Sequence, residues 1–330
     1  MTPLILVSIA LAPITAWGCA QLARLMRQRG VGQHIRELGP QGHATKAGTP
    51  TMGGAIVLLA WMIGVLCSRL SVSCTKEIGF ILAAGASHGL IGLADDLRSL
   101  RHRRSAGLSA AWKLLLGTFL AGGLFILFRG EVSVPQHIPF STITITLPPI
   151  ATFLVVWLGF LSTTNSMNLA DGLDGLASGL TLLILVGLLV LSPSGMSLSV
   201  GLPLLATLVG FLWVNGYPAQ IFLGDVGAFG LGGIIAAVSL CTGTIFFLPI
   251  VAGVLVLEAG SVIAQVSLFK LAGVRLFKMS PLHHHFEQSA RPGRSHVLRG
   301  FEWPETKVTL RFWLLQAVLV GIAIWAGVGV

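Results

Sequence analysis

This 330-residue sequence has very little charge: Asp, Glu, Lys and Arg together make up 10% of it, whereas 54% of the residues are hydrophobic. A soluble protein of this length needs far more charge on its surface, so the composition excludes the soluble classes. Only 12 residues are acidic, against 21 Lys and Arg. The few carboxylates are therefore the first place to look for chemistry.

Other features are also missing. The four cysteines are scattered without metal-ligand spacing and give no sign of a zinc site. Basic residues are not interleaved with aromatic ones, so we expect no nucleic-acid partner. The N-terminus lacks a basic n-region and a cleavage site, and we expect its apolar run to be retained as a span.

Long apolar runs dominate what is present, and the mean hydropathy is +0.86. Because a spanning helix needs about 20 apolar residues, the runs predict an all-α polytopic integral membrane protein with about ten transmembrane helices. We expect one domain over residues 1–330. The predicted spans are 3–24, 54–70, 77–94, 112–129, 149–164, 175–192, 198–215, 227–246, 249–269 and 310–328.

Lys and Arg concentrate on one side of this topology. Of the 21, 18 fall in the segments 24–53, 95–113 and 270–311. The positive-inside rule then places these loops in the cytoplasm and both termini in the periplasm. The net charge of +9 reflects this bias and an attraction to anionic lipid head groups of the bilayer. Residues 142–147 alternate and predict a small β-hairpin on the outer face.

The five aspartates fall in three short segments at the ends of apolar runs: Asp95-Asp96, Asp171 with Asp174, and Asp225. The predicted topology puts all five on the cytoplasmic side. Carboxylates are costly near hydrocarbon, so this grouping indicates a polar active-site cleft. Adjacent Asp95 and Asp96 repel each other, and a divalent metal or a nearby arginine would relieve the repulsion. A charged helix end with a surface ion pair would show the same pattern.

Two further segments are rich in polar or small residues. Residues 165–175 combine Asn, Asp and Gly at a density that suits a ligand-binding turn, although a helix N-cap looks similar. Asp225 is preceded by Asn215 and by Phe222, whose ring could stack on a base. The glycines of 227–233 superficially resemble a dinucleotide fingerprint. No strand precedes them, and packing of helices through small residues explains them better.

Three consecutive histidines, 283–285, cannot all face one way in regular structure, so we expect no three-His zinc site here. One or two of them facing a phosphate is the better interpretation. Glu258 lies inside an apolar run, where a carboxylate indicates either a function or a structural partner. Hard oxygen ligands and cationic donors in cytoplasmic loops suit Mg²⁺-assisted phosphoryl transfer from a charged soluble substrate to a membrane lipid.

Five segments resemble the signatures of the phospho-N-acetylmuramoyl-pentapeptide transferases, in that family's order. They are residues 46–54 (KAGTPTMGG), Asp95-Asp96, 168–176 (NLADGLDGL), 222–225 (FLGD) and 280–287 (SPLHHHFE). The resemblance covers essentially the whole chain and implies ten membrane helices and Mg²⁺. It implies transfer of phospho-MurNAc-pentapeptide from UDP-MurNAc-pentapeptide to undecaprenyl phosphate, giving lipid I and UMP in peptidoglycan biosynthesis at the bacterial inner membrane.

The resemblance also implies roles for individual residues. The catalytic residues would be Asp95, Asp96, Asp225, His283 and His284. Asp225 would bind Mg²⁺, and Asp95 would act on the lipid phosphate as a base or as a second metal ligand. The substrate-binding positions would be Lys46, Asn168, Asp171, Gly172, Leu173, Asp174, Asn215 and Phe222. In this family the ninth helix is broken and leaves a groove for the lipid carrier, and Glu258 lies there.

The chain departs from the family pattern in two places. Ser99 stands where the family has a lysine, and we expect Arg98 or Arg101 to supply the missing positive charge. Residues 288–301 look like an inserted cytoplasmic loop. A UDP-GlcNAc-dependent transferase of the same superfamily and an ion-coupled transporter are the alternatives. The SPLHHHFE segment argues against the first, and aspartates at helix ends argue against the second. The oligomeric state stays open, a homodimer included.

Overall fold

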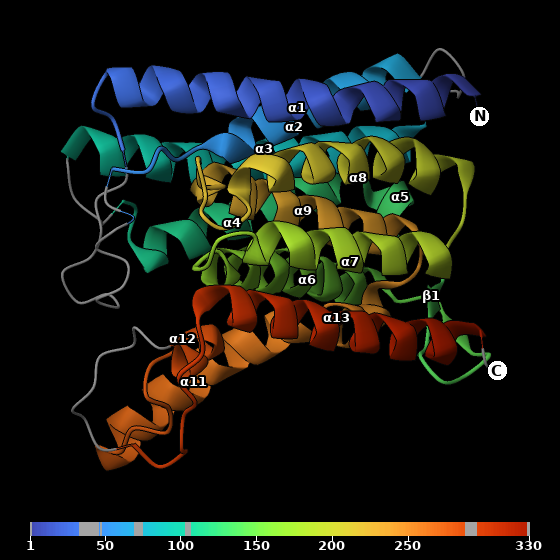
Figure 1. Ribbon diagram of the computed structural model, residues 1–330. Helices are drawn as coiled ribbons and strands as arrows, with labels where there is room; N and C mark the ends of the chain where they lie inside the picture. Colours follow the sequence, from blue (N-terminus) through green and yellow to red (C-terminus); the bar gives the residue numbers. More distant parts are fainter. Residues whose placement is uncertain are drawn as a thin grey trace.

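The chain folds into long α-helices that run side by side, as Figure 1 shows. This computed structural model describes residues 2–32, 46, 48–68, 75–102, 107–287 and 296–328. The longer helices are α1 (Thr2–Gln28), α2 (Gly53–Ser68), α3 (Lys76–His102), α4 (Ala110–Leu127), α6 (Pro149–Ala170), α7 (Leu176–Leu191), α8 (Gly195–Asn215), α9 (Gly224–Cys241), α11 (Gly253–Ala272) and α13 (Glu305–Val328). The short elements are α5 (Arg129–Val132), β1 (Gln136–His137), β2 (Thr144–Ile145), η2 (Ile245–Phe247), α10 (Leu248–Val251) and α12 (Leu282–Phe286).

Eight of the described helices are long and apolar enough to cross a bilayer: α1, α3, α4, α6, α8, α9, α11 and α13. The chain is therefore a polytopic membrane protein. Helices α2 and α7 are also apolar but have 16 residues each. Together these ten helices cover the ten predicted runs, while the number that cross the membrane stays a prediction. Most of the predicted insertion at 288–301 lies outside the described residues.

The ninth predicted run is interrupted. Helix α10 ends at Val251, Ala252 leaves helical geometry with φ −117° and ψ 31°, and α11 begins at Gly253. In Figure 1, α11 then runs obliquely away from the other helices. Its side chains are largely exposed in this protein, which suits contact with lipid. The break therefore lies where the family resemblance placed it, in the helix that carries Glu258.

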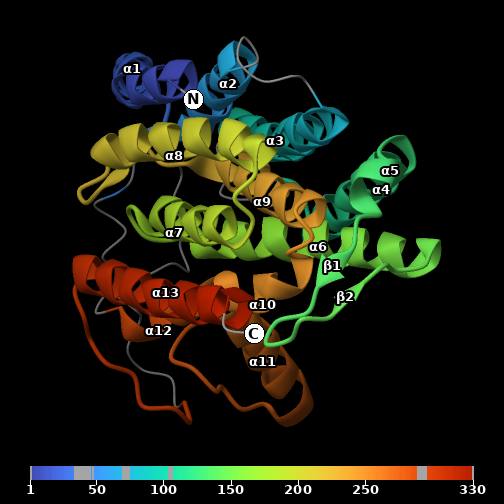
Figure 2. The ribbon, with the colours of Figure 1, turned by 90° about the vertical axis from the view of Figure 1, so that its right-hand side faces the viewer.

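Helix α9 lies in the interior of the bundle. It packs against α2, α3, α6 and α7, and Figure 2 shows it enclosed by its neighbours. Every residue from Val226 to Cys241 is buried. Small residues permit this close packing, since a Cβ at Gly54 would collide with Gly227, and one at Gly232 would lie 2.6 Å from the Cα of Thr164. The glycines of 227–233 therefore pack helices, as predicted.

The two ends of the bundle differ. Figure 1 places both chain ends and β1 at one end, and α12 at the other. Strands β1 and β2 pair antiparallel, with Gln136 opposite Ile145 and His137 opposite Thr144. Each strand has only two residues, fewer than the alternation over 142–147 suggested. Which end faces the cytoplasm stays a prediction from the charge bias.

Gly92 offers a test of this packing. A Cβ there would collide with the backbone carbonyl of Asp225, where α3 meets α9. Because backbone cannot yield as a flexible side chain does, Gly92→Ala should lower the free energy of unfolding by about 1–3 kcal/mol. Thermal unfolding of the detergent-purified protein would measure this. Gly123→Ala on α4 is the matched control, since a Cβ there meets nothing within 4 Å. Equal melting temperatures for the two variants would contradict the packing argument.

Candidate active site

Two carboxylates from different helices form the centre of the site. Asp225 on the first turn of α9 and Asp95 near the end of α3 lie within hydrogen-bonding range of each other. The Lys113 ammonium of α4 bridges them, at 2.5 Å from Asp225 Oδ2 and 3.3 Å from Asp95 Oδ1. Asn168 of α6 donates from Nδ2 to Asp225 Oδ1 at 2.7 Å. Four helices thus meet at one charged cluster.

Asp96 has a different position from its neighbour Asp95. Its carboxylate accepts hydrogen bonds from the N–H groups of Asp225, at 3.2 Å, and Val226, at 3.0 Å. Both donors belong to the first turn of α9, which has no intrahelical partner for them, so Asp96 caps this helix from another chain segment. Gly224 has φ +75°, and a Cβ there would lie 2.8 Å from Asp96 Oδ2. Glycine is therefore required next to Asp225.

Asp95 is covered by the segment that leads into α4. The Leu108 N–H donates to Asp95 Oδ1 at 2.5 Å, and a Cβ at Gly107 would lie 2.5 Å from both carboxylate oxygens. Asp95 is 7% exposed. The backbone at 107–108 therefore fixes the orientation of this carboxylate. The same segment leads into α4, which carries Lys113 on its first turn.

Lys113 was missed by the sequence argument, which expected Arg98 or Arg101 to supply the positive charge. Both arginines are exposed, whereas the ammonium that contacts the carboxylates belongs to Lys113. Its position in the sequence does point to a function, because Lys113 lies just inside the predicted span 112–129, where a charge is costly. The positive-inside rule treats it only as one of the cytoplasmic loop charges.

Residues 171–175 form a tight loop between α6 and α7. Gly175 has φ +73°, a conformation that glycine adopts without strain. The Asp171 carboxylate accepts from the Gly224 N–H beside the charged cluster, and burial, followed by the nearby Asp225 and Asp96, raises the pKa of Asp171 to about 8. Burial disfavours the charged form of a carboxyl group, and the neighbouring carboxylates add to this effect.

Asn215 and Asp174 hold this loop in place. Asn215 Oδ1 accepts from the Gly175 N–H at 3.2 Å and from Ser178 Oγ at 3.0 Å, while its Nδ2 donates to the Ile221 carbonyl at 3.0 Å. Its side-chain amide is thus engaged with the protein, and Asn215 is 4% exposed. Asp174 Oδ2 accepts from the backbone N–H of residue 219 at 2.9 Å.

Lys46 joins Asp174 to a residue that the sequence argument did not single out. Its Nζ lies 2.8 Å from Asp174 Oδ1 and 2.5 Å from Glu305 Oε1. Burial alone would lower the pKa of Lys46, but the Glu305 and Asp174 carboxylates outweigh it and raise the pKa above its usual value. Lys46 therefore stays charged. The Phe222 ring lies beside the same ammonium, which is 5.9 Å from the ring centroid.

The histidines lie on α12 and all three are buried. His283 Nδ1 is 3.1 Å from Glu258 Oε1 of α11, and both residues are 0% exposed. Glu258 therefore has a structural partner, one of the two roles considered for it. His284 Nδ1 is 2.8 Å from Glu287 Oε2. The first two histidines thus face different carboxylates.

The loop 171–175 brings these groups together. Asp171 faces the charged cluster, and Asp174 contacts Lys46 and Glu305. Gly172 lies against the His283 ring, because a Cβ at Gly172 would collide with His283 Nε2. Residues from all the segments of the family resemblance therefore gather at one end of the bundle, around a single loop.

The carboxylates of the charged cluster suit Mg²⁺ among the hard divalent cations. Among the described residues, no group of three or more His, Cys, Asp and Glu side chains is placed to hold a metal ion. Mg²⁺, however, commonly binds one or two carboxylates and takes its other ligands from substrate phosphates and water. Asp95 and Asp225 fit that mode because they are two adjacent carboxylates. The Lys113 ammonium between them shows that their position attracts positive charge.

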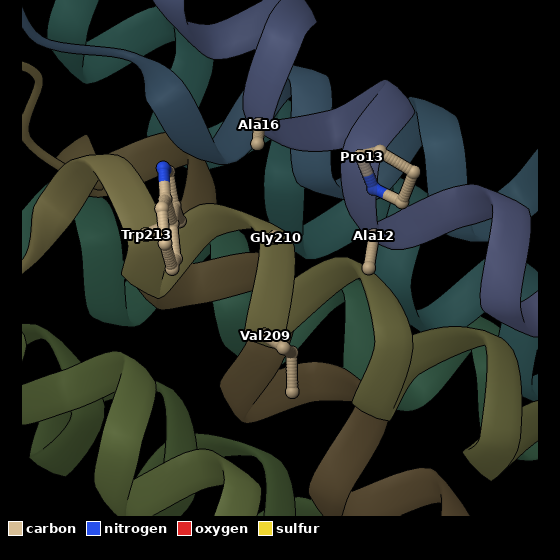
Figure 3. Close-up of a pocket in the computed structure, with 6 residues that line it drawn as sticks. All are labelled: Ala12, Pro13, Ala16, Val209, Gly210 and Trp213. Carbon is tan, nitrogen blue, oxygen red and sulfur yellow. The ribbon is translucent and has the colours of Figure 1, made fainter.

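A pocket elsewhere has different chemistry. It has a volume of about 340 Å³ and lies between α1 and α8 (Figure 3). Its lining is Ala12, Pro13, Ala16, Val209, Gly210 and Trp213. None of these side chains is ionisable, and the pocket does not include the carboxylate cluster. It therefore offers apolar surface and no catalytic group.

Comparison with known proteins identifies the family of this chain. The model of glycosyl transferase family 4 matches residues 78–243. A phospho-N-acetylmuramoyl-pentapeptide-transferase of Clostridium acetobutylicum is 40% identical over 296 residues, 88% of this chain and 89% of the relative. Proteins of the same name from Clostridioides difficile and Rubrobacter xylanophilus are 39% and 36% identical, over 92% and 89% of this chain and 91% and 88% of the relatives. The chain belongs to the phospho-N-acetylmuramoyl-pentapeptide-transferase family.

Proposed function

We propose that this chain transfers phospho-MurNAc-pentapeptide from UDP-MurNAc-pentapeptide to undecaprenyl phosphate, in a Mg²⁺-dependent reaction that forms lipid I and UMP. One observation carries the proposal: in a chain of this family, Asp95, Asp225 and Lys113 meet at one end of helices that are long enough to span a bilayer. A lipid phosphate and a soluble nucleotide can both reach such a position.

The reaction forms a bond from a lipid phosphate oxygen to the phosphorus that carries the sugar, and breaks the bond from that phosphorus to the oxygen of UMP. Negatively charged phosphates must meet, so positive charge is required. Asp225 and Asp95 would hold Mg²⁺, which supplies that charge to the diphosphate. Asn168 and Lys113 fix the Asp225 carboxylate through its two oxygens. Asp95 would also accept the proton of a protonated lipid phosphate.

Asp96 contributes through the backbone of α9. Because it holds the N–H groups of Asp225 and Val226, it sets the position of the Asp225 carboxylate. We therefore interpret Asp96 as a positioning residue, and Asp95 as the member of the pair that faces the reacting groups. This divides the catalytic role that the family resemblance implied for both.

The nucleotide would bind beside the loop 171–175. The Phe222 ring offers a face on which uracil can stack, a contact worth about 1–3 kcal/mol per base. Asp174, a substrate-binding position of the family resemblance, would stand beside the base, with its Oδ1 held by Lys46 and its Oδ2 by the backbone N–H of residue 219. Asn215 orders the loop, since its amide is engaged with the protein. His283 and His284 stay candidate phosphate donors, as the family resemblance implied.

An assay of UMP release tests the function. The purified protein with undecaprenyl phosphate and Mg²⁺ should release UMP from UDP-MurNAc-pentapeptide and not from UDP-GlcNAc. Asp225→Asn should lower the rate at least about 100-fold, because a hard ligand and a negative charge are lost. Glu131→Gln on α5, an acid-to-amide change at the opposite end of the bundle, is the control. UMP release from UDP-GlcNAc alone would favour the other branch of the superfamily.

A second assay compares the candidate cations. Lys113→Met removes the ammonium and leaves two carboxylates without their shared cation, so we expect a loss of activity of about 10- to 1000-fold. Lys113→Arg should recover part of it, because the guanidinium keeps the charge in another shape. Lys307→Met, at an exposed lysine of α13, is the matched control.

The same assay on Arg98→Ala and Arg101→Ala separates the two arrangements. Loss of activity in these variants, with full activity in Lys113→Met, would favour the arginines that the sequence suggested and would refute a role for Lys113.

Cysteine labelling tests the proposal that the site faces the cytoplasm. In a variant with Cys19, Cys67, Cys74 and Cys241 replaced by alanine, Thr142→Cys marks the β1–β2 end and Glu302→Cys marks the site end. A membrane-impermeant maleimide added to intact spheroplasts should label only Thr142→Cys, because the basic loops lie inside. Glu302→Cys should react after permeabilisation. The reverse pattern would invert the topology.

A further inference from the structure

Glu305 lies on the first turn of α13 and contacts two residues of the proposed nucleotide site. Its Oε1 accepts from Lys46 Nζ at 2.5 Å and from the backbone N–H of Asp174 at 2.7 Å. The Glu305 side chain is 11% exposed, so both contacts are shielded from water. One carboxylate oxygen thus holds a side chain and a main-chain group that come from different loops.

Helix α13 contacts the same loop at a second point. Thr309, four residues after Glu305 and therefore on the same helix face, donates from Oγ1 to the Asp174 carbonyl at 3.3 Å. One turn further, the Trp313 ring lies against Gly179 of α7, where a Cβ would collide with it. The first turns of α13 are thus fixed against α7, and they hold the main chain of Asp174 through both its N–H and its carbonyl.

Charge explains why a carboxylate is needed at this point. The Lys46 ammonium is shared between Asp174 and Glu305, and the two carboxylates keep the pKa of Lys46 above its usual value. Removing Glu305 would leave the Asp174 N–H without its acceptor and Lys46 with one carboxylate. A largely buried donor without a partner is costly, so the loop or the lysine would move.

We propose that Glu305 is a positioning residue of the nucleotide site: it holds the Lys46 ammonium against Asp174 and fixes the Asp174 main chain, so that both are placed to bind a uridine nucleotide. The inference rests on the proposed function, which assigns the nucleotide to this loop. Glu305 contacts neither Asp95 nor Asp225 among the hydrogen bonds and ion pairs found in the described residues, so the transfer step itself should depend on it little.

Isothermal titration of the full-length, detergent-purified protein with UDP-MurNAc-pentapeptide, in the absence of lipid acceptor, tests the inference. We expect Glu305→Ala to raise the Kd about 10- to 100-fold. Glu305→Gln should have a smaller effect, because its amide oxygen still accepts while the charge is lost. Glu302→Gln is the control, since Glu302 is 65% exposed and contacts Lys278 instead. It should bind as the wild type does.

Kinetics separate positioning from a general structural role. For Glu305→Gln, the KM for UDP-MurNAc-pentapeptide should rise, while kcat and the KM for undecaprenyl phosphate stay within about twofold. In a Lys46→Met background the effect of Glu305→Gln should shrink, because the two residues act together.

Three outcomes would overturn the inference: wild-type affinity in both Glu305 variants, equal losses for nucleotide and lipid, or additive effects of Glu305→Gln and Lys46→Met. Failure of the wild-type protein to bind UDP-MurNAc-pentapeptide would instead refute the proposed function.

Discussion

The close approach of the α9 N-terminus to α3 is the constraint on which the site depends. Gly92 allows the backbone of Asp225 to touch α3, and Asp96 accepts the N–H groups that open the helix. A wider separation would remove the cap and would move Asp225 away from Asp95 and its shared lysine. Close packing of small residues, which brings helices together in a membrane, therefore also sets the geometry of the carboxylates.

Charge is the second constraint. Two clusters of the protein have the same arrangement, in which one lysine lies between two carboxylates. Lys113 forms ion pairs with Asp95 and Asp225, and Lys46 forms ion pairs with Asp174 and Glu305. Each cluster has one cation for two carboxylates, so each keeps a surplus negative charge at the boundary of an apolar bundle. In the first cluster this surplus supports the proposal of a divalent cation. In the second it supports the proposal that a ligand with hydrogen-bond donors binds there.

The loop 171–175 lies between these clusters, and three of its residues face different neighbours. Asp171 faces the first cluster, Gly172 the His283 ring, and Asp174 the second cluster. These three contacts lie within a few residues of main chain. This explains why residues so far apart in the sequence can form one site within one helical bundle.

The sequence by itself determined the helical membrane class, the grouping of the aspartates at the ends of apolar runs and the packing role of the glycines in 227–233. These follow from local composition, which acts wherever the residues lie. The family resemblance named most of the residues that meet around the loop 171–175, but not the contacts that hold them there.

Only the tertiary structure decided which cation meets the carboxylates, which different groups Asp95 and Asp96 contact, and that Glu305 holds Lys46. Lys46 and Glu305 are 259 positions apart, and Lys113 and Asp225 are 112 apart. No local pattern specifies such pairs, because they depend on how whole helices are placed against one another.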